Sequence, residues 1–152
     1  PEWIDYNGHM NVAYYVLAFD HATDAFLDTL DLGLAYRQAT DCSFFVAESH
    51  VTYAQEVGEG QPLRFTTQVL AADGKRIHLF HCMYRDGDDT LVAANELMLL
   101  HVDLNIRRTA PLPDKQRQKV VAISLAHGML PRPPQAGSVM AIKPKPQPQP
   151  ES

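Results

Sequence analysis

One apolar segment near the N-terminus, residues 12–30, constrains the fold of this chain most strongly. Within it Tyr15, Phe19 and Phe26 recur at helical spacing, and Gly33 supplies a stop. The first half of the segment is apolar nearly all round, whereas a helix on the surface of a domain shows a polar face. We therefore predict one long helix that other parts of the structure wrap.

The segments that follow are typical of strands, because they are rich in Val, Leu, Phe, Tyr and Thr. They cover residues 42–57, 62–72, 75–85 and 90–104. Turn signals separate them: GEG at residues 58–60, DG at residues 73–74 and DGDD at residues 86–89. We predict four antiparallel strands in meander order, and hence an α+β domain whose sheet packs on one helix. Such a sheet leaves an edge or a face uncovered, so we expect a homodimer or homotetramer.

The C-terminal part of the chain changes in character. Residues 115–125 have weak helical periodicity and are expected to cap the sheet. Residues 131–152 form a Pro-rich tail whose composition predicts an extended or disordered segment that buries nothing. We therefore divide the chain into a domain at residues 1–130 and a tail at residues 131–152, and assign the tail no catalytic role.

Composition excludes several classes of protein. A chain of 152 residues with 45% hydrophobic content buries the core of one domain. A formal net charge of −5 argues against a nucleic-acid partner. Residues 12–30 do not read as a membrane span, because Asp20 and Asp24 interrupt them. Cys42 and Cys82 lie far apart with no CxxC pair, which favours a reduced, cytoplasmic setting.

The run DYNGHMN at residues 5–11 is the strongest candidate for a functional site, because it places the carboxylate of Asp5 just before a helix N-terminus. Unpaired N–H groups and a partial positive charge at such a terminus can polarise a substrate carbonyl while a carboxylate attacks it or activates water. Asn11 is a good N-cap. Aspartate is also a common turn or capping residue, so Asp5 has a purely structural interpretation as well. The crowded context favours function, and the pattern predicts acyl-transfer chemistry.

Three further side chains are candidates. His9 is suited to act as a general acid, as a general base or as a hydrogen-bond donor that orients a neighbouring group. A histidine in a tight turn, however, often forms hydrogen bonds only with the backbone. Glu48 and His50 share one face of a predicted strand and can act together. If that face packs on the helix, a buried Glu48 needs a partner. If it faces solvent, the pair means little.

Other chemistries lack their motifs. The chain has no HExxH, GxSxG, GxGxxG or GxxxxGK[ST] sequence. His78 and His81 are three residues apart in a predicted strand, which directs them to opposite faces. We therefore predict no metal site.

Residues 5–11, followed by Tyr15 and Phe19 on the helix, resemble the hotdog-fold acyl-CoA thioesterases of the 4-hydroxybenzoyl-CoA thioesterase type. The resemblance covers residues 1–104 and implies a long central helix wrapped by an antiparallel sheet, with a first strand just before residue 1. It assigns the essential carboxylate to Asp5 and the amide that polarises the thioester carbonyl to Val12. It implies no cofactor, since CoA is part of the substrate, and leaves open whether Asp5 forms an acyl anhydride or activates water. Other members of the family carry a catalytic Glu inside the long helix. This chain does not match them cleanly, but Asp20 lies near the corresponding position.

More of the chain resembles the thioesterase-like domain fused to some L-carnitine dehydrogenases, and their stand-alone betainyl-CoA thioesterase relatives. The matching motifs are Glu48-x-His50, TTQVL at residues 66–70, KRIH at 75–78, MLLHVD at 98–103 and LPRP at 130–133. This resemblance implies hydrolysis of betainyl-CoA to glycine betaine and CoA, a step of carnitine breakdown.

A quaternary ammonium group must be bound without hydrogen bonds, by aromatic faces and a carboxylate. Glu48 is the predicted counter-charge, and Asn11, Tyr15 and His50 are further candidates for substrate binding. The available rings are Trp3, Tyr6, Tyr14, Tyr15, Phe44 and Phe45. Two alternatives stay open: a hotdog hydratase or dehydratase, which needs a His with an acidic partner, and a non-catalytic acyl-CoA-binding module.

Overall fold

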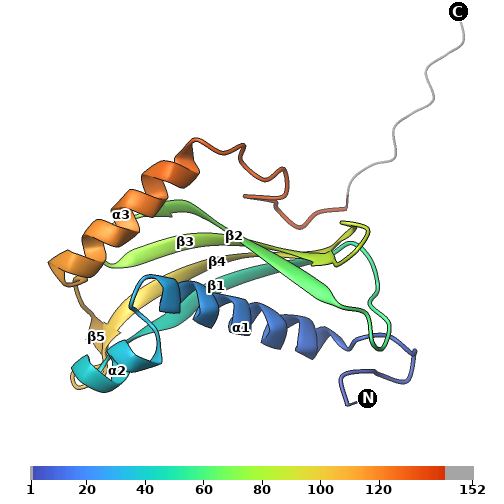
Figure 1. The fold of residues 1–152 in the computed structure, drawn as a ribbon, viewed down its shortest axis with the longest axis horizontal. Helices are drawn as coiled ribbons and strands as arrows, with labels where there is room; N and C mark the ends of the chain where they lie inside the picture. Colours follow the sequence, from blue (N-terminus) through green and yellow to red (C-terminus); the bar gives the residue numbers. More distant parts are fainter. Residues whose placement is uncertain (1, 143–152) are drawn as a thin grey trace, which may run out of the picture.

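The computed structural model describes residues 2–142 and shows an antiparallel sheet with a long helix across one face (Figure 1). The elements are α1 (Val12–Thr29), α2 (Leu34–Thr40), β1 (Cys42–Tyr53), β2 (Leu63–Ala72), β3 (Arg76–Arg85), β4 (Leu91–Asp103), β5 (Arg108–Thr109) and α3 (Asp114–Gly128). We call the face of the sheet that packs on α1 the inner face and the opposite one the outer face. The predicted α+β class is confirmed.

The predicted long helix is confirmed as α1, which begins after Asn11 and ends at Thr29, before the expected stop at Gly33. Leu30 closes it with a backbone N–H to the last carbonyls of the helix. Gly33 instead begins α2, a helix that the sequence did not indicate. A side chain at Gly33 would collide with Asp28, because a Cβ there would lie 1.7 Å from the Asp28 Oδ1 atom.

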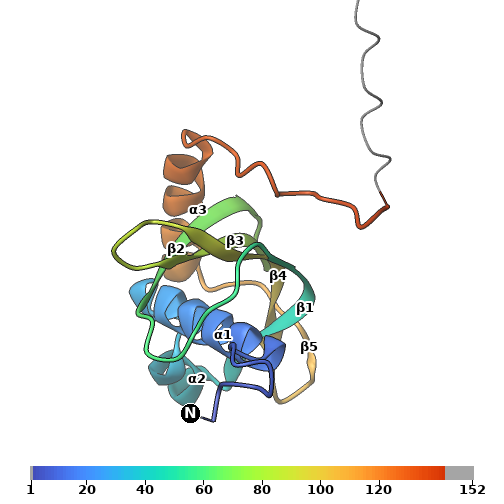
Figure 2. The same cartoon turned by 90° about the vertical axis from the view of Figure 1, so that its right-hand side faces the viewer.

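Within one chain, the first half of α1 is wrapped on one side. Tyr15 and Phe19 are buried, but Val12, Val16 and Leu17 keep 59%, 48% and 37% of their surface exposed. The reason is geometric: the sheet is one layer and covers one side of the helix, as Figure 2 shows. An apolar strip on the other side of α1 is left without cover.

The predicted meander is correct for β2, β3 and β4 and wrong for β1. The order in the sheet is β1-β4-β3-β2, and β1 pairs along its length with β4, from Cys42 opposite Asp103 to Tyr53 opposite Ala93. The GEG turn therefore does not make a hairpin. Residues 54–62 instead carry the chain from one edge of the sheet to the other, and Val57 is buried on the way in a cluster with Met10 and Tyr15.

The second edge of the sheet, β2, is covered by α3, so the expected C-terminal helix is confirmed and is longer than expected. The N–H group of Val69 in β2 donates to His127 Nδ1 of α3 at 2.9 Å. Val120 of α3 is fully buried in the core. β1, in contrast, has no strand beyond it among the described residues.

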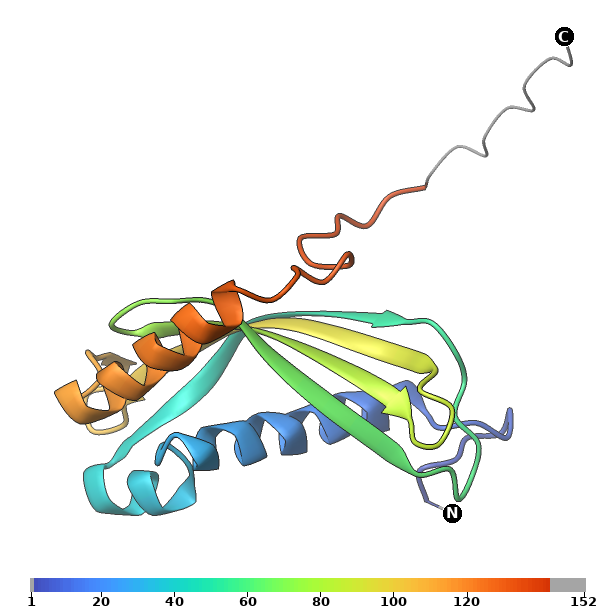
Figure 3. The same ribbon diagram turned by 45° about the horizontal axis from the view of Figure 1, so that its top comes forward.

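The described part of the tail, residues 131–142, contains no helix or strand and continues from the end of α3 (Figure 3). Two hydrogen bonds join it to the sheet. Gln68 Nε2 donates to the carbonyl oxygen of Pro131 at 3.3 Å. The N–H group of Gly137 donates to Glu96 Oε2 at 2.6 Å. The tail therefore contacts the outer face, where we expected no contact. The prediction for residues 143–152 lies outside the described residues.

A buried histidine joins α1 to the sheet. His81 has no exposed surface, and its ring lies between Thr23 Oγ1, 3.0 Å from Nε2, and Thr67 Oγ1, 2.8 Å from Nδ1. The Thr23 hydroxyl donates to the Phe19 carbonyl. It therefore accepts from Nε2–H, which leaves Nδ1 to accept from Thr67 in a neutral ring. Burial lowers the pKa of His81 from 6.5 to about 4. His78 lies on the outer face, as its spacing from His81 predicted.

The depressed pKa of His81 predicts acid-sensitive stability. The unfolded chain takes up the proton below its pKa of 6.5, whereas the folded chain resists it until about 4. As the pH is lowered from 6.5 to about 4, the free energy of unfolding should therefore decrease. This residue contributes about 3 kcal/mol of that decrease. Urea unfolding of the wild type and a His81→Gln variant across this range measures the effect. The variant should lose this part of the slope, and an unchanged slope would contradict the assignment.

Candidate active site

The loop before α1 folds into a tight hairpin. Ile4 and Met10 form an antiparallel bridge, the N–H group of Asp5 donates to the His9 carbonyl at 2.9 Å, and Gly8 N–H donates to the Asp5 carbonyl at 3.0 Å. Gly8 has a φ of +82°, which glycine adopts readily and other residues avoid. Because Asp5 and His9 stand directly opposite each other in this pairing, their side chains leave the backbone on the same side.

The carboxylate of Asp5 uses one of its two oxygens in the hairpin. Its Oδ1 atom accepts from the N–H group of Asn7 at 2.8 Å, which is the turn role. Its Oδ2 atom has no hydrogen-bond partner among the described residues. One oxygen therefore holds the hairpin, while the other is available to a substrate.

The N-terminus of α1 presents one unpaired amide beside this hairpin. Asn11 is the N-cap as predicted, since its Oδ1 atom accepts from the N–H group of Ala13 at 3.0 Å. Its carbonyl accepts from Tyr14 N–H at 2.9 Å. The N–H group of Val12 has no partner within residues 2–142. It is therefore the free donor at the positive end of the helix.

A pocket of about 320 Å³ brings these groups together, and we call it the Asp5 pocket. Its lining residues are Asp5, His9, Met10, Val12, Tyr15, Tyr53, Ala54, Gln55 and Glu56. Four of the predicted site residues, Asp5, His9, Val12 and Tyr15, thus share one cavity. Lysine and arginine are absent from this lining. The phosphates of CoA therefore need another surface.

Among the lining residues that were not predicted, Tyr53 and Glu56 bring an aromatic ring and a carboxylate to the Asp5 pocket. Glu56 Oε2 lies 3.0 Å from His9 Nε2. The ring of Tyr53 meets that of Tyr15 edge to face, with centroids 5.1 Å apart. The hydroxyl of Tyr15 donates to the Gln55 carbonyl at 3.3 Å, and burial raises its pKa, so it stays protonated at neutral pH. Sequence patterns did not indicate these contacts, because residues 54–57 were predicted to form the end of a strand.

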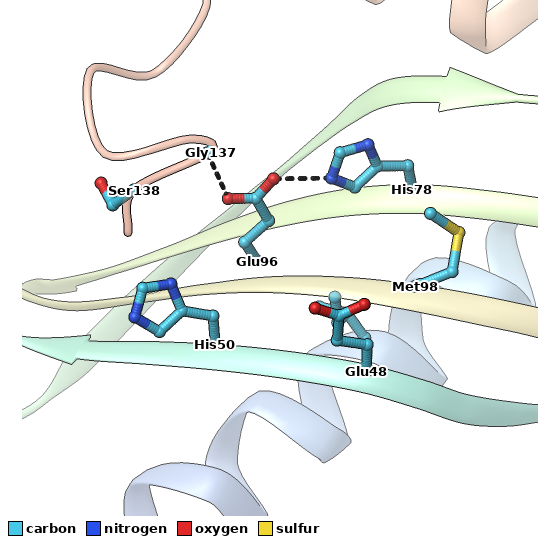
Figure 4. A pocket seen from close by; sticks show the side chains of 8 residues that line it. Glu48, His50, His78, Glu96, Met98, Gly137 and Ser138 are labelled. Carbon is cyan, nitrogen blue, oxygen red and sulfur yellow. Dashed lines mark hydrogen bonds and ion pairs between the residues drawn. The ribbon is translucent and has the colours of Figure 1, made fainter. Parts of the chain in front are cut away.

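Glu48 and His50 lie elsewhere. They line a separate pocket of about 330 Å³ on the outer face, together with His78, Glu96 and residues of the tail (Figure 4). Side chains alternate along β1, and the neighbouring Ser49 reaches the inner side, where its hydroxyl donates to Asn95 Oδ1 at 2.7 Å. Within one chain the structure therefore does not bring Glu48 or His50 to Asp5.

Of the six rings considered for a cationic group, only Tyr15 lines the Asp5 pocket. Trp3 and Tyr14 stack on each other with centroids 5.1 Å apart. Phe44 packs on His101 in the second part of the core, and the ring centroids are 5.3 Å apart. Tyr6 and Phe45 are exposed. Asp20, the alternative carboxylate, is exposed on α1 and is not among the residues that line the pocket.

The described part of the chain has neither a metal-binding cluster nor a membrane-spanning helix. Across residues 2–142, His, Cys, Asp and Glu side chains form no group of three or more that could hold a metal ion. In the same residues, no helix has the length and apolar character needed to cross a membrane.

Comparison with known proteins identifies the family. The profile of the thioesterase-like superfamily matches residues 1–120. A hypothetical protein of Staphylococcus aureus, solved in complex with CoA, superposes with a TM-score of 0.87 at 29% identity and covers 93% of this chain and 89% of its own. The chain therefore belongs to the thioesterase-like superfamily, as an acyl-CoA thioester hydrolase with the hotdog fold.

Two relatives of known activity match most of this chain. The betainyl-CoA thioesterase of Pseudomonas aeruginosa is 40% identical over 144 residues, which cover 95% of this chain and 91% of that protein. The L-carnitine dehydrogenase/betainyl-CoA thioesterase of Ruegeria pomeroyi is 39% identical over 140 residues, 91% of this chain but 28% of that protein. The chain thus matches nearly all of the first relative and about a quarter of the second.

The cap of α1 gives a testable prediction. Asn11→Ala removes the acceptor for Ala13 N–H and should lower the free energy of unfolding by about 1 kcal/mol. Asn11→Ser keeps a capping oxygen and is the matched control, with a much smaller expected loss. Urea unfolding measures both variants. Equal stabilities of the two variants would show that the cap does not hold the helix end.

Proposed function

We propose that the chain hydrolyses betainyl-CoA to glycine betaine and CoA in the Asp5 pocket. One observation carries the catalytic part of the proposal: an oxygen of Asp5 and the N–H group of Val12, both without a partner within residues 2–142, line the same cavity. The substrate is supported by the likeness to the P. aeruginosa betainyl-CoA thioesterase, which spans 95% of this chain.

In the proposed reaction the thioester carbonyl oxygen accepts a hydrogen bond from Val12 N–H. The positive end of the helix dipole then stabilises the negative charge that develops on this oxygen. Asp5 acts in one of two ways. Its Oδ2 atom attacks the carbonyl carbon and expels the thiolate, and water hydrolyses the resulting anhydride; or Asp5 takes a proton from a water whose oxygen attacks. Both routes consume one water and release a carboxylate and CoA.

His9 is the proposed source of the proton that the departing thiolate takes up. Its ring leaves the hairpin on the same side as Asp5 and is held 3.0 Å from Glu56 by Nε2. All the groups that this route uses belong to the chain, so the proposal includes no cofactor and no metal.

The two alternatives named from the sequence differ in what happens to the thioester. The His9–Glu56 pair is an imidazole with an acidic partner, which the hydratase or dehydratase alternative requires. Such an enzyme leaves the thioester intact, and a binding module does so as well. Membership of the thioesterase-like superfamily favours hydrolysis over both.

We also propose that the protein works as a homo-oligomer in the cytoplasm. Val12, Val16 and Leu17 form an exposed apolar strip on α1, and β1 is a free edge strand, so a second copy can cover both. A dimer satisfies these contacts, and a tetramer would need further surface. Cys42 and Cys82 are free thiols, which suits a reducing compartment.

Loss of the Asp5 carboxylate should abolish hydrolysis. We expect Asp5→Asn to lower kcat/KM for betainyl-CoA by about 100-fold or more, because an amide neither attacks nor accepts the proton. Release of free thiol measures the rate. Asp86→Asn removes an exposed carboxylate outside the pocket and is the control. An Asp5→Asn variant with the wild-type rate would show that Asp5 is misassigned, and a wild type that releases no thiol would reject hydrolysis.

The apolar strip on α1 predicts the effect of a charge on assembly. Val16→Glu places a carboxylate where we expect the second copy, and should shift the protein from dimer to monomer in sedimentation velocity. Val121→Glu changes an exposed valine of α3, 42% exposed, and is the matched control. The proposed interface at α1 is contradicted if the Val16→Glu variant sediments as the wild type does, or if both variants dissociate to the same extent.

A further inference from the structure

We infer that Tyr53 and Glu56 recognise the cationic part of the acyl group. This inference rests on the proposed function, and it names the specificity residues of the same site. It replaces the counter-charge expected from the sequence, Glu48, with a carboxylate that the fold brings to the reacting centre.

The chemistry of the substrate restricts where recognition takes place. In a betainyl thioester the quaternary nitrogen is bonded to the carbon next to the carbonyl carbon. When that carbonyl is held between Asp5 and Val12, the cation must lie in the same cavity. Glu48 lines the outer pocket, on the opposite face of the sheet, whereas Tyr53 and Glu56 line the Asp5 pocket.

Tyr53 presents an aromatic face that is held in place. Its ring stands at 87° to the ring of Tyr15, and Tyr15 is itself fixed by its hydrogen bond to the Gln55 carbonyl. An edge-to-face contact occupies at most one face of the Tyr53 ring, and 47% of the residue is exposed. A cation over the remaining face is attracted by the ring quadrupole and needs no hydrogen bond.

Glu56 supplies the negative charge. Its Oε2 atom is engaged by His9 at 3.0 Å, and its Oε1 atom has no partner among the described residues. The charged side chains that line the pocket are the two carboxylates of Asp5 and Glu56, with His9 as the one titratable base. Unit charges a few ångströms apart interact measurably even near the surface. The pocket therefore favours a cationic acyl group over a neutral one of the same shape.

The test compares two substrates that differ only in charge: betainyl-CoA and tert-butylacetyl-CoA, in which a carbon replaces the quaternary nitrogen. The wild type should prefer the cationic thioester. Glu56→Gln should lower kcat/KM for betainyl-CoA by about tenfold more than kcat/KM for the neutral thioester. Any loss that arises from the contact between Glu56 and His9 is common to both substrates. Tyr53→Leu should show the same selective loss. Tyr53→Phe keeps the ring face and should therefore keep the wild-type preference for betainyl-CoA over the neutral thioester.

Controls separate this inference from the proposed function. Asp86→Asn tests the effect of overall charge and should leave the preference unchanged. Glu48→Gln tests the rival counter-charge. Equal losses for both substrates in Glu56→Gln, or a selective loss in Glu48→Gln alone, would overturn the inference. A wild type that cleaves both thioesters equally well would also overturn it while leaving thioester hydrolysis intact. A wild type that cleaves neither would reject the proposed function itself.

Discussion

The candidate site depends on one backbone hydrogen bond, from Met10 N–H to the Val57 carbonyl at 2.8 Å. It ties the hairpin before α1 to the segment that leaves β1, and Val57 is buried against the base of the helix. Tyr53 and Glu56, on this side of the contact, line the same cavity as Asp5 and Val12. The crossing from β1 to β2 is therefore both a topological connection and part of the candidate site.

The single-layer sheet imposes a second constraint. One layer covers one side of α1, so the helix keeps Val12, Val16 and Leu17 exposed near its N-terminal end. The outer face, in contrast, is contacted by the tail through Gly137, and the β2 edge is covered by α3 through His127. The surfaces left for a second copy are therefore on the side of α1 and at β1. Assembly and catalysis are proposed to use neighbouring parts of the same helix.

Local patterns in the sequence predicted the parts of the structure that local forces decide. The spacing of Tyr15 and Phe19 predicted α1, and Asn11 was predicted as its N-cap. The alternation of side chains along a strand predicted that His78 and His81 lie on opposite faces. The pairing of β1 with β4 joins distant segments, and no turn signal between β1 and β2 reveals it. Tyr53 and Glu56 reach the site by the same long-range route, which is why sequence spacing missed them and favoured Glu48.

The central claim is that Asp5 and the N-terminus of α1 hold the thioester carbonyl between them. A crystal structure with a betainyl-CoA analogue, in which a methylene group replaces the thioester sulfur, tests it most directly. The account predicts the ketone oxygen within hydrogen-bond distance of Val12 N, the Asp5 carboxylate beside the carbonyl carbon, and the trimethylammonium group against Tyr53 and Glu56. An analogue bound with its carbonyl in the outer pocket, beside Glu48 and His50, would contradict it.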